Sequence, residues 1–204
     1  SSVRARASSE GSSMAYRALG SIAQVQIQRS SLKAGERPNR YYDPAPLLVV
    51  PRLRLTVGGV FGLTDDGNEQ IDVHHADHSQ SKNRSCNGIS IGFTSHYQAM
   101  RERFGPYLTD GIAGENILVA CDTPVTLDDL GEYLIIETAD GTRIALGQLM
   151  VAAPCVEFSH FAAAQEERLP AEALKAMLQF LNDGIRGFYA TLDDASEGAI
   201  VQPG

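Results

Sequence analysis

The amino-acid sequence predicts a mainly β fold, an antiparallel β-barrel with a few peripheral helices. Many short stretches alternate apolar and polar residues, only two stretches have clear helical periodicity, and no strand–helix–strand rhythm recurs. The chain has 204 residues, of which 43% are hydrophobic and 21% charged, a composition that supports one packed domain. We expect residues 1–20, which are rich in serine, to be a disordered tail or a non-native remnant, and residues 21–204 to form the barrel domain.

The first half of the domain supplies short strands separated by polar loops. Residues 21–27 form a strand-like stretch, and 31–46 form a polar loop that contains proline. Residues 47–57 are predicted to form one or two strands. Four glycines punctuate 58–67, which marks a turn before the short strand at 71–73.

A strand and a helix follow a long polar loop in the middle of the chain. Ile89, Ile91 and Phe93 alternate with polar or small residues, which is typical of a half-buried strand. The next segment, Thr94–Phe104, is predicted to be a helix that Thr94 or Ser95 caps and that Gly105 ends.

The second half continues the β pattern and contains the clearest helix. Asp140-Gly141 predicts a tight hairpin turn between two β-rich stretches, and 148–153 continues as a strand. Pro170 opens a helix over 171–181 with an apolar stripe. The stripe comprises Leu174, Met177, Leu178 and Leu181. Residues 187–192 and 199–201 are predicted to form a last pair of strands. Alternation places eight residues at inward or inter-element positions: Ile89, Ile91, Ile117, Val119, Leu134, Ile136, Ile144 and Met150.

Charge and composition exclude several classes of function. The net charge is −8, yet residues 1–104 carry 13 Lys and Arg against 9 Asp and Glu, so the basic residues lie in the first half. An acidic chain argues against nucleic-acid binding but leaves room for a small anionic ligand. No apolar run approaches the roughly 20 residues of a membrane span. Three cysteines do not form a disulfide framework, so we expect a reducing, cytoplasmic location.

Cys155 is the strongest candidate for chemistry, because it follows a strand and a proline, where a thiol can be exposed at a cleft. Lys82 and Arg84, in the long polar loop, are the expected anion contacts. No histidine or lysine adjoins Cys155 in sequence, so its activation must come from residues distant in the chain, for which His78 and His96 are the candidates. A less favoured alternative places a metal at His74, His75 and His78.

Three segments resemble, in order, one known family. GIAGENILV (111–119) resembles a Gly-Glu-Asn signature, APCVEF (153–158) resembles a strand that ends in Pro-Cys, and 177–204 resembles a closing helix followed by a GFYA strand. Together they are similar to the MOSC domain family, the molybdenum-cofactor sulfurase C-terminal domain. The resemblance covers roughly residues 20–204 and implies a MOSC-like antiparallel β-barrel.

The resemblance also implies a function. A stand-alone MOSC protein would bind the molybdenum cofactor (molybdopterin) and carry or transfer sulfur as a persulfide, either as a sulfur transferase or as a component of a molybdenum-cofactor-dependent oxidoreductase. Cys155 would hold the sulfur or contact molybdenum, and Gly114, Glu115 and Asn116 would form the signature turn beside it. The chain has no pyridoxal-phosphate domain, so a partner protein would donate the sulfur.

Departures from the family pattern keep alternatives open. Ala152 and Ala153 stand where an arginine often precedes the Pro-Cys pair, and 62–67 lacks the basic residues expected after the second strand. These differences favour a second hypothesis, a non-catalytic ligand-binding module that keeps the barrel. A third hypothesis is a metal-dependent hydrolase built on the histidine loop.

Overall fold

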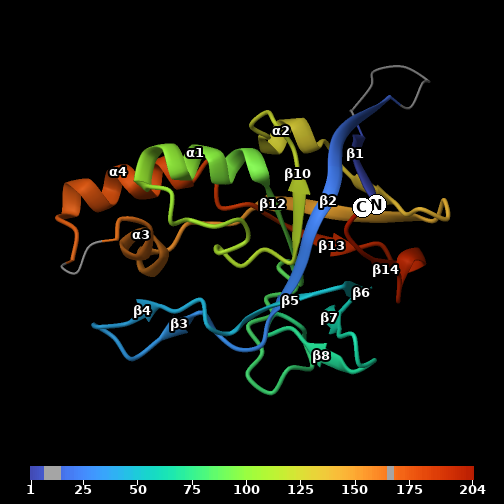
Figure 1. Ribbon diagram of the computed structural model, residues 1–204, viewed down its shortest axis with the longest axis horizontal. Helices are drawn as coiled ribbons and strands as arrows, with labels where there is room; N and C mark the ends of the chain where they lie inside the picture. Colours follow the sequence, from blue (N-terminus) through green and yellow to red (C-terminus); the bar gives the residue numbers. More distant parts are fainter. Residues whose placement is uncertain (7–14, 165–167) are drawn as a thin grey trace.

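A closed seven-stranded β-barrel lies at the centre of the computed structural model, which describes residues 1–6, 15–164 and 168–204 (Figure 1). The barrel strands, in spatial order, are β1 (Ser2–Arg6), β11 (Leu134–Glu137), β12 (Arg143–Val151), β13 (Phe188–Leu192), β9 (Ile89–Phe93), β10 (Ile117–Ala120) and β2 (Tyr16–Gln28). The ring closes because β1 pairs with both β11 and β2. Strands β9 and β10 pair in parallel and the other neighbours antiparallel, so the barrel is mixed, and the predicted mainly β class is confirmed.

Smaller sheets flank the barrel. Strand β5 (Leu47–Val50) extends from β2. A four-stranded sheet consists of β14 (Ile200–Val201), β6 (Arg52–Thr56), β7 (Gly59–Leu63) and β8 (Glu69–Ile71). A separate hairpin consists of β3 (Lys33–Ala34) and β4 (Tyr41–Tyr42).

The helices gather mostly on one side of the barrel (Figure 1). They are α1 (Thr94–Phe104), α2 (Leu127–Leu130), α3 (Val156–Ala162) and α4 (Ala171–Leu181), with a 3₁₀ turn at Asp194–Ser196. Helix α3 packs against both α4 and β4, which brings the β3–β4 hairpin close to the segment after Cys155. Within the described residues, no helix has the length and apolar character needed to cross a membrane.

Two hydrophobic clusters stabilise this arrangement. The barrel interior contains the inward residues of its strands, including Val25, Ile91 and Phe188. The second cluster lies under the helices and contains Tyr97 and Phe158. Because apolar side chains of the hairpin, α1, α3 and α4 share the second cluster, it fixes the position of the hairpin relative to the barrel.

The N-terminal segment corrects the expected boundary at residue 21. Strand β1 lies within the predicted tail, and Val3 and Ala5 are buried in the barrel. Strand β2 likewise begins at Tyr16. The strand was not predicted because the segment is rich in serine and its inward face has only one valine and one alanine at alternate positions. The rest of the predicted tail, 7–14, lies outside the described residues.

Most inward positions match the alternation, with one exception. Seven of the eight residues are buried, but Met150 is 40% exposed. The pairing of β12 with β13 shifts between Gly147 and Met150, and Gln148 has a φ of +50°. This bulge inserts a residue, so the inward positions change from even to odd numbers beyond it.

Two local predictions are also wrong. Phe93 occupies the N-cap of α1 and no side chain caps this helix, although its predicted bounds are confirmed. The last two strands exist but do not pair with each other, because β14 joins β6 and β13 lies between β12 and β9.

Candidate functional site

A cavity of about 750 Å³ lies where the β3–β4 hairpin, the polar loop at 82–87 and the turn at 113–115 meet the strand end before Cys155. We call it the Arg84 cavity. Six cationic side chains line it: Lys33, Arg37, Arg40, Lys82, Arg84 and Arg186. Among its described lining residues, Glu115 carries the single carboxyl group. The cavity is thus strongly positive in a protein that is acidic overall.

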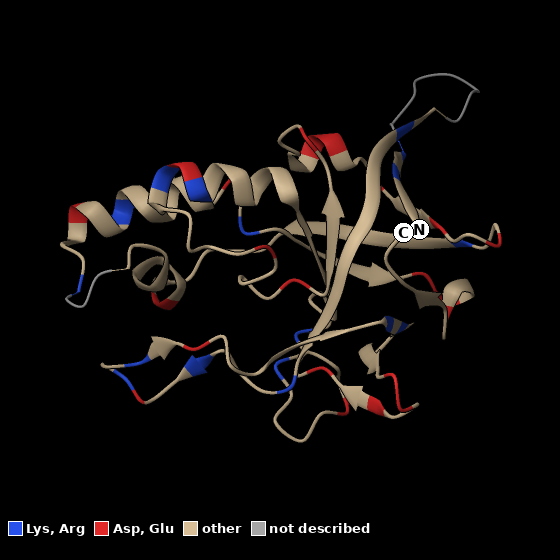
Figure 2. Cartoon of the chain, in the orientation of Figure 1, with Lys and Arg blue, Asp and Glu red and all other residues tan. Residues whose placement is uncertain are grey.

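The β3–β4 hairpin supplies three of these cations. Lys33, Arg37 and Arg40 lie on it, and Figure 2 shows basic residues on both arms of this hairpin. Tyr42 anchors the hairpin, because its ring lies 5.1 Å from that of Phe158 and its hydroxyl donates a hydrogen bond to the Ile112 carbonyl at 2.6 Å. Burial raises the pKa of the Tyr42 hydroxyl, while nearby Arg186 opposes this shift, so Tyr42 is a neutral wall of the cavity.

Arg186 comes from the turn between α4 and β13. Its guanidinium carbon lies 4.0 Å from the centre of the Phe158 ring, and Nη1 donates to the Ala113 carbonyl at 3.0 Å. Its Nε is shielded from solvent and has no hydrogen-bond partner among the described residues. Burial alone would lower the pKa of Arg186, but the neighbouring Tyr42, Cys155 and other acidic groups raise it. Arg186 therefore keeps its charge beside the cavity.

Lys82 and Arg84, which we expected from the sequence, line the same cavity as Cys155. Asn87 shapes their loop, because its side chain accepts a hydrogen bond from the Arg84 amide at 2.7 Å and donates one to the Lys82 carbonyl at 3.0 Å. Asn87 is buried, so the loop is held from inside while the two cationic side chains stay exposed.

Cys155 is partly exposed and lies at the start of α3. Its Sγ accepts a long hydrogen bond from the Phe158 amide at 3.5 Å, and its carbonyl accepts from the Ser159 hydroxyl at 3.0 Å. The residue lines the Arg84 cavity and also a second, adjoining cavity. The thiol therefore faces open space on the cationic side of the molecule.

The signature turn contributes backbone and one buried acid. Gly114 has a φ of +98°, and a Cβ there would lie 2.7 Å from Gln28 Nε2. Glu115 is buried and accepts a hydrogen bond from the Tyr97 hydroxyl at 2.5 Å, while its other oxygen has no partner among the described residues. Burial raises the pKa of Glu115, although the charge of Arg186 and the Tyr97 hydrogen bond both lower it.

Asn116 does not line the cavity, although the resemblance places it in the signature turn beside Cys155. Its side-chain amide donates to the Gln26 carbonyl at 3.2 Å and to Asp72 Oδ2 at 3.0 Å. Its side-chain oxygen accepts from the Ser90 amide and hydroxyl. Asn116 thus joins three chain segments behind the cavity, and a single sequence pattern could not distinguish this role from ligand binding.

The two histidines proposed to activate Cys155 lie elsewhere. His78 Nε2 lies 3.0 Å from the Arg29 carbonyl, and His96 is buried, where its Nε2 accepts from the Val125 amide at 3.1 Å. Neither lines the cavity. Burial lowers the pKa of His96, so it is a neutral core residue next to Phe93 and Phe188.

The histidine loop does not assemble the ligands that the hydrolase hypothesis requires. His74 Nδ1 lies 3.3 Å from Asp72 Oδ1, His75 Nε2 lies 3.1 Å from the Thr56 hydroxyl, and His78 contacts the backbone. In the part of the chain that the structure describes, no three His, Cys, Asp or Glu side chains converge as a metal site.

Sequence reasoning missed four of the six cations in the Arg84 cavity. Three lie within the segment KAGERPNR (33–40), whose density of basic residues is the signal that could have indicated them. The fourth, Arg186, stands between Gly184 and Gly187 in a turn. Its position beside Cys155 depends on tertiary packing that no local pattern records.

Comparisons with known proteins support the fold alone. No protein-family model matches the chain, and no curated protein matches it. The chain is similar in structure to the YUAD protein from Bacillus subtilis, with a TM-score of 0.55, 16% sequence identity and coverage of 90% of this chain and 92% of that one. At this identity the similarity extends to the barrel and its decorations and carries no residue roles.

Proposed function

We propose that this chain binds a phosphate-bearing anionic cofactor of the molybdopterin type in the Arg84 cavity and carries sulfur on Cys155. The observation that carries the proposal is the shared lining of one cavity by a partly exposed cysteine and six cations. The resemblance of 111–119, 153–158 and 177–204 to the MOSC domain family supports the same conclusion.

The residues present fit such a ligand. Arginine forks and lysine ammonium groups match phosphate oxygens in charge and geometry. The unpartnered Nε of Arg186 is a buried donor beside the cavity, and an anion would give it a partner. When bound, a molybdenum cofactor supplies a metal that accepts sulfur and exchanges electrons. The chain itself supplies Lys82 and Arg84 to bind the anion, Arg186 to hold positive charge, and the thiol of Cys155.

Sulfur loading needs only a persulfide donor, R–S–SH. The Cys155 thiolate attacks the outer sulfur of the donor, the new bond forms between Sγ and that sulfur, and the S–S bond of the donor breaks. The donor leaves as a thiolate that takes a proton from solvent, so no external oxidant is needed. Arg186 stabilises negative charge on the attacking and the product sulfur, because Cys155 lies within its electrostatic reach.

Mass spectrometry tests the sulfur step. After incubation with glutathione persulfide, we expect a gain of one sulfur atom on Cys155, while Cys86→Ser and Cys121→Ser still gain it and Cys155→Ser does not. Sulfur distributed over all three cysteines, or absent from Cys155, would contradict sulfur carriage.

Molybdopterin released anaerobically from a molybdoenzyme serves as the binding probe, and we expect Arg84→Gln with Lys82→Gln to weaken its binding at least tenfold. Equal binding to the wild type and the double variant would refute the cofactor site.

Alkylation tests the electrostatics separately. The positive cavity attracts anionic reagents. The ratio of the iodoacetate rate to the rate with neutral iodoacetamide should therefore be about tenfold higher at Cys155 than at Cys86 at low salt. Cys86 is the internal control because it lies in the polar loop and lines neither cavity. A rate ratio that is the same at both thiols would contradict this picture.

A non-catalytic binding module is the second candidate. It is favoured by Ala152 and Ala153 before Pro154, and by the positions of His78 and His96 away from the thiol. In that case the cofactor probe binds, but Cys155 takes up no sulfur.

A further inference from the structure

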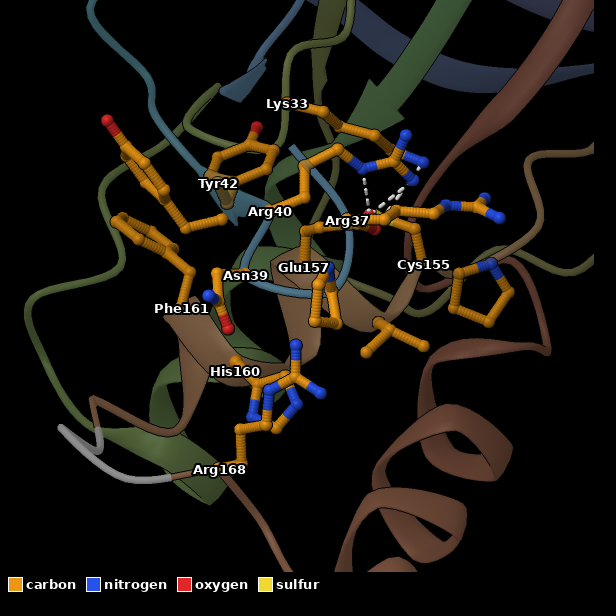
Figure 3. A pocket seen from close by; sticks show the side chains of 14 residues that line it. Lys33, Arg37, Asn39, Arg40, Tyr42, Cys155, Glu157, His160, Phe161 and Arg168 are labelled. Atoms are coloured by element: carbon orange, nitrogen blue, oxygen red, sulfur yellow. Dashed lines mark hydrogen bonds and ion pairs between the residues drawn. The ribbon is translucent and has the colours of Figure 1, made fainter. Parts of the chain in front are cut away.

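A second cavity, of about 860 Å³, adjoins the Arg84 cavity and is also lined by Cys155; Figure 3 shows its lining side chains. We call it the Arg168 cavity. Six residues line both cavities: Lys33, Arg37, Arg40, Tyr42, Pro154 and Cys155. The Arg168 cavity adds lining residues from the hairpin tip, α3 and the segment before α4, among them Asn39, His160 and Arg168.

Part of the positive charge in the Arg168 cavity is already neutralised. Glu157 on α3 forms ion pairs with Lys33, at 3.5 Å, and with Arg40. Burial would raise the pKa of Glu157, but hydrogen bonds from its own backbone and from Arg40, together with the charge of Lys33, lower it. The carboxylate is therefore charged and compensates these two cations, which Figure 3 shows gathered around it.

Two cations of the Arg168 cavity are not compensated in this way. Among the residues that the structure describes, Arg37 and Arg168 form no ion pair. Figure 3 shows Arg168 beside His160 at the end of the cavity away from Lys33 and Arg40. Anion-binding capacity therefore extends into both cavities, because Lys82 and Arg84 line only the Arg84 cavity, Arg168 lines only the Arg168 cavity, and Arg37 lines both.

Apolar surface also lines the Arg168 cavity, in addition to these charged groups. Tyr41 and Val156 are 58% and 44% exposed, and both line the Arg168 cavity together with Phe161. Exposed apolar groups among cations match a ligand with a ring or an apolar segment next to an anionic group. The chemistry of the lining is thus mixed, and simple phosphate would use only part of it.

We propose that the two cavities form one elongated site, which binds a ligand with two anionic groups, one in each cavity, joined by a ring or an apolar segment. The inference rests on the anion site of the proposed function and defines the shape of its ligand. It does not depend on sulfur transfer, because it concerns only the charges and surfaces around the thiol.

A series of α,ω-alkane bisphosphonates with increasing spacer length tests this proposal, with methylphosphonate as the single-anion reference. Binding is measured by titration calorimetry with the full chain at low salt. We expect one spacer length to bind with one ligand per chain and at least tenfold tighter than methylphosphonate, because the second group binds intramolecularly. Affinity that does not change with spacer length would overturn the proposal.

Charge variants identify which cations bind each of the two anionic groups of the ligand. Arg168→Gln should remove most of the gain for the optimal bisphosphonate while leaving methylphosphonate binding within twofold of wild type, and Arg84→Gln should weaken both ligands. Lys175→Gln, an exposed charge on α4 that lines neither cavity, is the matched control and should change neither. Equal effects of Arg168→Gln and Lys175→Gln would also overturn the elongated site. Absence of methylphosphonate binding would instead overturn the anion site of the proposed function, so the two failures are distinguishable.

Discussion

Gly114→Ala is the sharpest test of how the signature turn supports the cavity. Gly114 adopts a φ of +98°, which costs a residue with a side chain about 1 kcal/mol. A Cβ would also lie 2.7 Å from Gln28 Nε2 and 2.8 Å from Leu32 Cδ1. Gln28 Nε2 donates to the Gly114 carbonyl at 2.9 Å, and its displacement would lose a hydrogen bond worth about 1 kcal/mol. Together with the shift of Leu32, the expected loss in unfolding free energy is about 2–3 kcal/mol.

Gly141→Ala is the matched control, because Gly141 has a similar φ of +84° but nothing within 4 Å of an added Cβ. Its expected cost is the backbone term alone, about 1 kcal/mol. Urea unfolding followed by circular dichroism measures both, and Gly114→Ala should unfold at the lower denaturant concentration without a change in slope. If Gly114→Ala loses no more than Gly141→Ala, then the close approach of Gln28 and Leu32 does not constrain the turn, and the reasoning is refuted.

Two further substitutions separate the support of the cavity from its thiol. Asp72→Asn should destabilise the fold by about 3 kcal/mol, because the buried carboxylate accepts from the Gln28 and His74 amides and from Asn116, and an amide group in its place turns one acceptor into a donor; an unchanged urea midpoint would contradict this role. Cys155→Ser should shift the melting temperature by less than about 2 °C, since a serine oxygen can also accept from the Phe158 amide, whereas a large fall would show that the thiol is chiefly a packing group.

The barrel could be predicted from the sequence because the alternation of apolar and polar residues is a local signal. Ile117 and Val119 face inward as their spacing requires, and the predicted bounds of the 94–104 helix match α1. Alternation fails where a bulge changes its phase, as at Gln148, since nothing in the local sequence marks the inserted residue. Helix α3, with seven residues, is too short for a periodic pattern, and it was missed.

The candidate site was accessible only in part. Cys155 and Arg84 stand out locally, the first by its strand end and the second by its polar loop, and they line one cavity. Arg186 reaches the same cavity from a turn that follows α4, and the hairpin cations reach it because Tyr42 packs on Phe158. Such convergence depends on contacts between residues far apart in the chain, such as Tyr42 and Phe158, which a single sequence without related sequences does not reveal.

The buried acid beneath Arg186 leads to a last prediction, that anion binding is coupled to proton uptake. The pKa of the Glu115 carboxyl depends on Arg186, on Tyr97 and, more weakly, on Asp110. Among these three, only Arg186 also lines the cavity and favours the charged carboxylate by its own charge. An anion bound at Arg186 offsets that charge and so raises the pKa of Glu115 further, and the carboxyl takes up a proton.

Sulfate is the appropriate probe of this coupling, because it does not titrate near neutral pH. Linkage requires its affinity to fall as the pH rises through the pKa of Glu115 in the free protein and to level off above the pKa in the complex. Glu115→Gln cannot titrate at this position, so its sulfate affinity should stay flat over the same range, and Gly141→Ala should retain the wild-type profile. A wild-type affinity that does not change as the pH rises from the ordinary range of a carboxyl pKa toward neutrality would mean that the bound anion does not act on Arg186. The same slope in Glu115→Gln would assign the coupling to another group.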